Sequence, residues 1–269
     1  MAVAEGGVTE GRLTAGLPYL RLGQGPPLVM APGLSAEHAN PTGLMRRVSL
    51  SSAGPFAGHF TVYLANRKAG LAPGSTMSDI AGDYAKAIED DIGGPVALHG
   101  TSTGGSVALQ LAIDYPHLVR RLVLAAAACR LSPHGRQMQA EVARLVEAGE
   151  PRRASALLAE SLAPGSLRHP AGALAWLFGR SWAANDPADM LITIAAEDTF
   201  DAEPGLHRVQ APTLVVGGSA DPFYSEDLFR RTAAGIPNGR AVIFPGKGHL
   251  SAAGSKAAAN IGLGFLLGG

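Results

Sequence analysis

Short apolar runs alternate along the chain with segments in which apolar residues return every third or fourth position. The first pattern is typical of buried strands, and the second of helices that turn one face to a core. We expect strands over residues 17–22, 28–31, 60–64, 95–99, 122–128, 213–216 and 241–244. Helices are expected after Ser78, from about Val107 to a point before Pro116, after Ser225 and over residues 252–267. Because the two kinds of element alternate, the pattern predicts an α/β fold: a mostly parallel twisted sheet with helices on both faces.

The alternation of strand and helix patterns stops between residues 130 and 201, where only helical periodicity is present. Segments of this kind surround Val142, begin at Pro151, include Trp176 and follow Asp186. A run of helices without a strand does not continue a parallel sheet, so it indicates an insertion. We therefore predict a core domain formed by residues 1–129 and 202–269, with an all-helical cap over residues 130–201.

Composition narrows the class of protein. The chain has 269 residues, of which 46% are hydrophobic and 16% charged, so it has enough apolar surface for one large folded domain with an insertion. The 22 basic residues balance the 22 acidic ones. Because nucleic acids and anionic membranes attract basic proteins, we expect neither as a partner, and we expect a monomer or homodimer acting on a small molecule.

Two further counts bear on location and metal binding. The single cysteine, Cys129, excludes an internal disulfide and a multi-cysteine metal site, and no other metal-ligand motif is present. No secretory signal is apparent in residues 1–11, and the longest apolar run, 122–129, is too short to span a bilayer. These features favour a cytoplasmic protein without a cofactor or metal.

The segment Gly100-Thr101-Ser102-Thr103-Gly104 follows a predicted strand and opens a predicted helix. A serine on such a tight turn has an exposed hydroxyl, and the helix start offers free N–H groups for an oxyanion. The alternative is a phosphate-binding turn, which is disfavoured because no lysine-containing phosphate loop and no acidic ribose partner accompany it. The arrangement predicts Ser102 as a nucleophile.

A nucleophilic serine needs a base, and the base needs a carboxylate to fix its tautomer. Asp221 follows the predicted strand 213–216, and His249 follows the strand 241–244. Because parallel strands end at one edge of a sheet, we expect Ser102, Asp221 and His249 to meet there. Asp198 and Asp201 precede a strand and are interpreted as loop or helix-end charges.

With these segments in view, the chain resembles the α/β-hydrolase superfamily over nearly its full length apart from the insertion. The resemblance rests on residues 99–105, 212–221 and 246–249, together with Pro32-Gly33-Leu34 after an early strand. It implies that the backbone N–H groups of Thr103 and Leu34 form the oxyanion hole. Epoxide hydrolases and haloalkane dehalogenases of this family use an aspartate nucleophile at this turn. The serine at position 102 therefore excludes these two reactions.

The loop that begins at Pro32 carries Leu34, and we call it the oxyanion loop. We expect Gly33 of this loop to line the substrate pocket, together with His38, which lies close to it. Four residues of the cap are expected to form an apolar roof over the substrate: Trp176, Phe178, Trp182 and Met190. For the aromatic residues and the methionine, packing of the cap on the core is an equally good interpretation.

The leading functional hypothesis is a serine hydrolase that cleaves carboxylic esters of a small, fairly apolar molecule. The same triad is compatible with hydrolysis of a C–C bond, thioester or lactone, and with cofactor-free perhydrolysis. A third hypothesis is a receptor-like protein of the same fold that binds a ligand in the pocket with little turnover.

Overall fold

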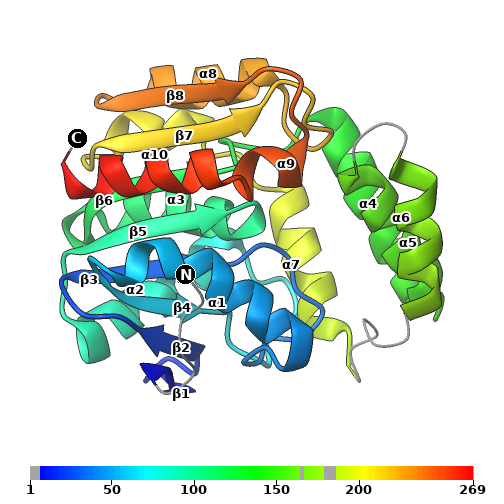
Figure 1. Cartoon of the computed structure of the whole chain (residues 1–269), viewed down its shortest axis with the longest axis horizontal. Helices are drawn as coiled ribbons and strands as arrows, with labels where there is room; N and C mark the ends of the chain where they lie inside the picture. The colour runs from blue at the N-terminus through cyan, green and yellow to red at the C-terminus, as the bar shows by residue number, and fades with distance from the viewer. Residues whose placement is uncertain (1–6, 164–166, 179–185, 269) are drawn as a thin grey trace.

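A computed structural model of the chain describes residues 7–163, 167–178 and 186–268. Its centre is an eight-stranded sheet in the order β1-β2-β4-β3-β5-β6-β7-β8 (Figure 1). The strands from β3 to β8 run parallel, whereas β1 and β2 are antiparallel to their neighbours. The strands span Thr9–Arg12 (β1), Pro18–Leu22 (β2), Pro27–Ala31 (β3), Thr61–Ala65 (β4), Val96–Thr101 (β5), Val119–Ala125 (β6), Thr213–Gly218 (β7) and Gly239–Phe244 (β8).

Helices cover both faces of this sheet. Successive residues of a strand point to opposite faces, so the apolar runs of the central strands supply two separate cores. On one face Leu98 packs with α2 (Met77–Ala87), α3 (Thr103–Asp114) and α8 (Glu226–Gly235). On the other face Ala97 packs with α1 (Gly43–Ala57) and α10 (Lys256–Leu267). The predicted mostly parallel sheet with helices on both faces is confirmed.

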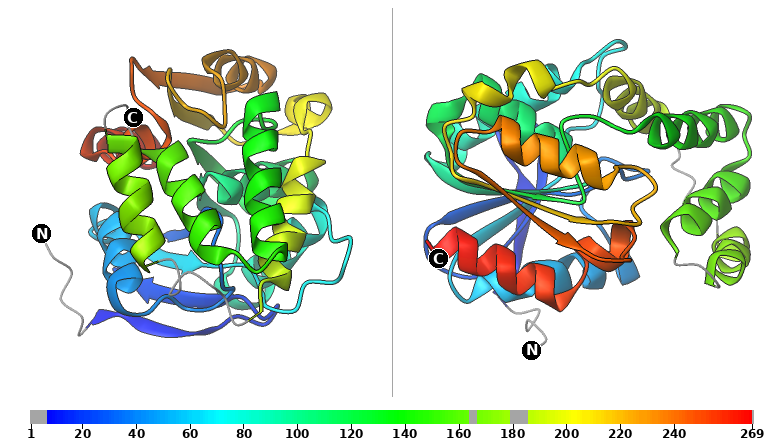
Figure 2. Two further views of the ribbon diagram at one scale, coloured as in Figure 1. Left: turned by 90° about the vertical axis from the view of Figure 1, so that its right-hand side faces the viewer. Right: turned by 90° about the horizontal axis from the view of Figure 1, so that it is seen from above.

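Four further helices lie beyond the carboxyl ends of the strands (Figures 1 and 2): α4 (Pro133–Glu147), α5 (Pro151–Leu162), α6 (Arg168–Phe178) and α7 (Ala188–Asp198). Apolar side chains of α4, α5 and α7 form their own small core. We call this group of helices the α4–α7 segment; the division of the chain into core and cap at residues 130 and 201 stays a prediction. Among the residues described, no helix is both long and apolar enough to cross a membrane.

Several elements differ from the expectation. The pattern missed α1, because this helix contains Pro55 and exposes Leu44, Met45 and Val48, so that no regular apolar stripe marks it. It also missed β1, a short polar strand held by its pairing with β2. The helix expected after Ser78 begins at Met77 and is capped by Thr76, whose side chain accepts the Asp79 N–H.

The boundaries of two other elements moved. The strand expected at 122–128 is β6 at 119–125, and the closing helix is divided into α9 (His249–Ala253) and α10. Ser255 caps α10 by accepting the Ala258 N–H, which explains why a new helix starts there.

Candidate active site

Ser102 occupies the tight turn between β5 and α3, with φ 52° and ψ −127°. A positive φ at a residue with a side chain costs about 1–3 kcal/mol, and residues strained in this way are frequent at active sites. A Cβ on Gly100 would lie 2.4 Å from the Gly104 carbonyl oxygen, and a Cβ on Gly104 would lie 2.2 Å from the Ala31 carbonyl oxygen. The two glycines are therefore required because β5, α3 and the end of β3 approach one another here.

Hydrogen bonds connect the loop that follows β7 to the loop that follows β8. The Ala220 N–H donates to the Lys247 carbonyl at 3.0 Å, and the Gly246 N–H donates to Ser219 Oγ at 2.8 Å. Asp221 follows on the first loop and His249 on the second. These bonds bring residues far apart in the sequence to one place at the edge of the sheet.

Ser102, His249 and Asp221 form a continuous hydrogen-bonded chain. His249 Nε2 lies 3.0 Å from Ser102 Oγ, and His249 Nδ1 lies 2.7 Å from Asp221 Oδ2. A carboxylate only accepts, so Nδ1 carries the proton and Nε2 is free to accept from the serine hydroxyl. The imidazole is buried, and the second oxygen of Asp221 accepts the N–H groups of Phe223 and Tyr224.

The alternative acids lie elsewhere. Asp201 forms an ion pair with Arg130 at 3.1 Å, and Asp198 is exposed at the end of α7. The structure thus brings together the three residues that the sequence analysis selected and leaves the alternatives out.

Of the two expected oxyanion donors, Thr103 follows the serine in the chain, and Leu34 follows Gly33, which approaches the serine. Thr103 is the first residue of α3, a position whose N–H has no partner within the helix. Gly33 approaches the serine closely, since a Cβ added to it would lie 3.4 Å from Ser102 Cβ. The Gly33 carbonyl is directed to Arg67, and because a trans peptide is planar the following Leu34 N–H points the opposite way.

The guanidinium of Arg67 holds the oxyanion loop. Arg67 follows β4, is 1% exposed, and donates to the Pro32 carbonyl at 3.2 Å, the Gly33 carbonyl at 3.0 Å and Ser35 Oγ at 3.0 Å. Its Nε donates to His38 Nε2 at 3.1 Å. A planar group with several fixed donors can fix a loop in this way, whereas an ammonium cannot.

A family model described as "Alpha/beta hydrolase family" matches residues 28–259, which include Ser102, Asp221 and His249. The chain belongs to the alpha/beta hydrolase family. Among its relatives is a protein of Mycobacterium tuberculosis named "Putative non-heme bromoperoxidase BpoC", 27% identical over 202 residues, which are 72% of this chain and 77% of BpoC. Another is the "Putative carbamate hydrolase RutD" of Pseudomonas savastanoi pv. phaseolicola, 30% identical over 161 residues, which are 56% of this chain and 60% of RutD.

The fold of this alpha/beta hydrolase agrees with solved structures. A hydrolase from Pseudomonas aeruginosa PA01 superimposes with a TM-score of 0.77 at 23% identity, covering 99% of this chain and 100% of that one. Family membership and the names of the relatives support an enzyme of the hydrolase class.

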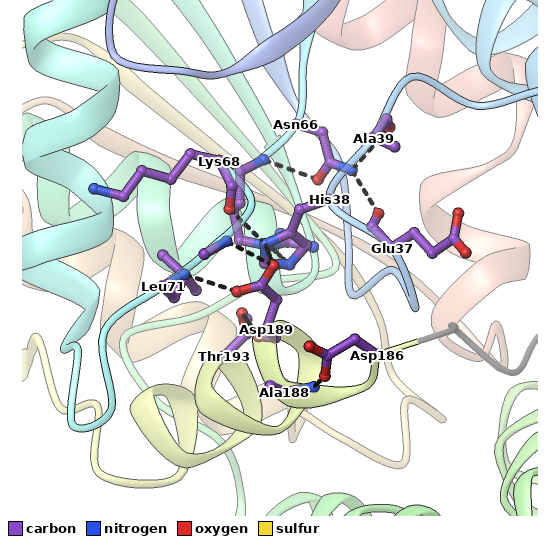
Figure 3. Close-up of polar contacts among 12 residues, drawn as sticks. Glu37, His38, Ala39, Asn66, Lys68, Leu71, Asp186, Ala188, Asp189 and Thr193 are labelled. Carbon is purple, nitrogen blue, oxygen red and sulfur yellow. Dashed lines mark hydrogen bonds and ion pairs between the residues drawn. The ribbon is translucent and has the colours of Figure 1, made fainter.

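His38 lies inside a polar network of this alpha/beta hydrolase and is 3% exposed (Figure 3). Its Nε2 accepts from Arg67, so the proton is on Nδ1, which donates to the Lys68 carbonyl at 2.8 Å. Burial, together with the charge of Arg67, lowers the pKa of His38 from 6.5 to about 4. Asp189 of α7 accepts the Leu71 N–H at 2.7 Å in the same network, which ties the α4–α7 segment to the core.

The lowered pKa makes stability depend on pH. Between pH 6.5 and about 4 the unfolded chain binds a proton at His38 and the folded chain does not, so the contribution of neutral His38 is complete above pH 6.5 and decreases as the pH falls. From pH 7 to pH 4.5, His38→Asn is expected to lose roughly 2 kcal/mol less unfolding free energy than the wild type. Urea unfolding at both pH values measures this, and equal losses in the two proteins would contradict it.

Two of the remaining predicted pocket residues, Trp176 and Met190, have described side chains in the α4–α7 segment. Met190 is 2% exposed and packs with Ile194 in a cluster that Leu34 of the oxyanion loop also contacts. Trp176 is 45% exposed, and the guanidinium of Arg152 lies 4.9 Å from its ring. Phe178 ends α6 with no described side chain, and Trp182 lies outside the described residues. Contact of these residues with a substrate stays a prediction.

Two buried charged residues of the site were missed by the sequence analysis: Arg67 and Glu197. Arg67 stands in a glycine-containing loop, where nothing in the sequence distinguishes it from an exposed arginine. Glu197 did carry a signal, because it falls seven residues after Met190 and three after Ile194, on the apolar face of α7. A charged residue in that register indicates a buried polar partner.

Proposed function

We propose that this enzyme hydrolyses carboxylic ester-type bonds of a small, fairly apolar substrate through an acyl-enzyme. The observation that carries the proposal is the hydrogen-bonded chain from Ser102 Oγ to His249 at 3.0 Å and from His249 to Asp221 at 2.7 Å. This is the spacing over which an imidazole removes a proton from a serine while a carboxylate stabilises the imidazolium.

In the acylation step, His249 Nε2 takes the hydroxyl proton as Ser102 Oγ attacks the carbonyl carbon. The carbonyl oxygen becomes an oxyanion that accepts from the Thr103 and Leu34 N–H groups. The tetrahedral intermediate collapses, the C–O bond to the alcohol breaks, and the imidazolium protonates the departing alkoxide. Asp221 keeps the ring in its tautomer throughout.

In the deacylation step, water takes the place of the alcohol. His249 removes a proton from the water as its oxygen attacks the acyl carbonyl, and the same two N–H groups stabilise the second oxyanion. The bond to Ser102 Oγ breaks, the proton returns to the serine, and the carboxylic acid leaves.

The surroundings support an apolar substrate. Leu34 and Ala36 of the oxyanion loop pack against the small core of the α4–α7 segment, which contains Met190 and Val142. Apolar side chains so close to the proposed oxyanion donor favour an uncharged acyl or alcohol group beside the serine.

The name of one relative favours a second reaction, perhydrolysis. Hydrogen peroxide would attack the acyl-enzyme in place of water, releasing a peracid and free Ser102, and the peracid would oxidise bromide. The test is bromination of a diketone by the wild type in the presence of hydrogen peroxide, bromide and a carboxylic acid or ester. Bromination that requires the carboxylic acid or ester supports perhydrolysis. No bromination in the complete mixture excludes it.

A fluorophosphonate probe tests the nucleophile directly. We expect one phosphonyl group per chain, mapped by peptide mass spectrometry to Ser102, together with turnover of p-nitrophenyl esters, thioesters or lactones in a substrate panel. Labelling of another residue would refute the assignment, and slow turnover with tight stoichiometric binding would favour a receptor.

A further inference from the structure

Glu197 is a fully buried acidic residue that the proposed mechanism does not use. It lies near the end of α7 and is 0% exposed. Its Oε2 accepts from Thr103 Oγ1 at 2.7 Å and from Gln139 Nε2 at 3.0 Å. Its Oε1 accepts from Ser106 Oγ at 2.8 Å and from Tyr224 Oη at 3.1 Å.

These contacts suit a carboxylate. A carboxylate has about four lone-pair positions, and here each oxygen has two partners that can donate to it, so all four positions are used. A buried negative charge with neutral donors is costly and is retained where its field or its geometry is used. Burial lowers the pKa of Arg67, and the field of Glu197 is among the charges that counteract this effect.

The donors connect Glu197 to both halves of the catalytic group. Thr103, whose N–H is the proposed oxyanion donor, is fixed at the start of α3 by its bond to the carboxylate. The ring of Tyr224 stacks on the ring of His249, with 6.0 Å between the centroids and 13° between the planes. Burial, with a contribution from Glu197, raises the pKa of Tyr224 well above 10, so its hydroxyl stays a donor.

We propose that Glu197 is a positioning residue for the triad. By accepting from Thr103 and Tyr224 together, its carboxylate holds the oxyanion amide and the face of the His249 imidazole in one arrangement, and its charge stabilises the imidazolium that forms in each step. The proposal rests on the serine hydrolase mechanism proposed above. It also assigns the α4–α7 segment a share in catalysis, because Glu197 and Gln139 belong to it.

A structural role alone would need the hydrogen bonds and not the charge. Glu197→Gln separates the two, because the glutamine oxygen can accept from Thr103 and Gln139 while its NH₂ donates to the hydroxyls of Ser106 and Tyr224. The matched control is Asp198→Asn, which removes one charge from the neighbouring, exposed position of the same helix.

Two readouts report on the charge. We expect Glu197→Gln to lower kcat about 3- to 10-fold with KM within twofold, and to move the acid limb of kcat/KM to lower pH by about half a unit to one unit. The NMR titration of the His249 ring, assigned by its loss in His249→Gln, should move by the same amount. Asp198→Asn should leave both readouts unchanged.

The other ionisable groups around the His249 ring and residue 197 are the same in the wild type and in Glu197→Gln. Asp221 and Tyr224 face His249 from the loop after β7, and Arg67 faces Glu197 from the loop after β4. A difference between wild type and Glu197→Gln therefore reports the charge of residue 197. If Glu197→Gln matches the wild type in kcat, in the acid limb and in the ring titration, the proposal is wrong.

A second variant covers the case in which Glu197→Gln does not fold. Tyr224→Phe keeps the ring over His249 and removes the hydroxyl that ties it to the carboxylate, so kcat should fall at least about threefold with KM unchanged. An unchanged kcat in this variant would overturn the proposed positioning.

Failure of this proposal is distinguishable from failure of the proposed function. The ring titration needs no substrate, so it tests Glu197 even if no ester is turned over. Ser102→Ala is expected not to react with the fluorophosphonate. If the wild type also fails to react, the serine mechanism is wrong. If the wild type reacts, and Glu197→Gln reacts and titrates identically, only the role of Glu197 is wrong.

Discussion

Ser102→Ala is expected to lower kcat for ester hydrolysis by about 10⁴-fold or more while the fold stays intact. The reason is that the hydroxyl oxygen is the only non-hydrogen atom removed, and it lies 3.0 Å from His249 Nε2. Without it no acyl-enzyme forms, and only slow attack by water in the oxyanion site remains. Initial rates on the best ester of the panel measure the loss, with circular dichroism as the check on folding.

Ser102→Gly makes a sharper control for the same position. The backbone at Ser102 has φ 52° and ψ −127°, which glycine adopts without the strain that a side chain brings. We expect both variants to be inactive, but Ser102→Gly to be more stable than Ser102→Ala by about 1 kcal/mol in urea unfolding. Turnover in either variant at the wild-type rate would remove the serine from the mechanism, and equal stability of the two would argue against strain at the turn.

Arg67→Met is expected to destabilise the fold by about 3–5 kcal/mol and to lower kcat of the remaining folded protein about 10²-fold. The side chain fills similar space but donates nothing, so the Pro32 and Gly33 carbonyls and His38 Nε2 are left buried without their partner. The loop that carries the Leu34 N–H is then free to move away from the oxyanion.

Two variants make the Arg67 prediction specific. Arg47→Met removes an exposed arginine from α1 and should change neither stability nor kcat. Arg67→Lys keeps the charge but not the fork of donors, so it should recover part of the stability and little of the rate. The measurements are urea unfolding and kcat for the wild type and for Arg67→Met, Arg67→Lys and Arg47→Met. Wild-type kcat in Arg67→Met would mean that the oxyanion loop does not need this support.

Much of the fold could be predicted because the information is local. Each buried strand is an apolar run, and the tight turn at Ser102 carries its glycines within two residues on either side. Asp221 and His249 could be selected for a similar reason, since each follows a strand, and parallel strands with a common direction end at a common edge. The elements that escaped, α1 and β1, have no apolar pattern of their own and are held by contacts with distant segments.

The sequence by itself therefore determined the class of fold, most of its strands and helices apart from α1 and β1, and three side chains that could meet at one edge. Only the tertiary structure decided which buried charges surround them. Arg67 and His38 are 29 residues apart, and Thr103 and Glu197 are 94 apart. A hydrogen bond between such residues leaves no periodic trace in the chain, because its cost and its gain depend on burial that arises only when the sheet, the oxyanion loop and α7 pack together.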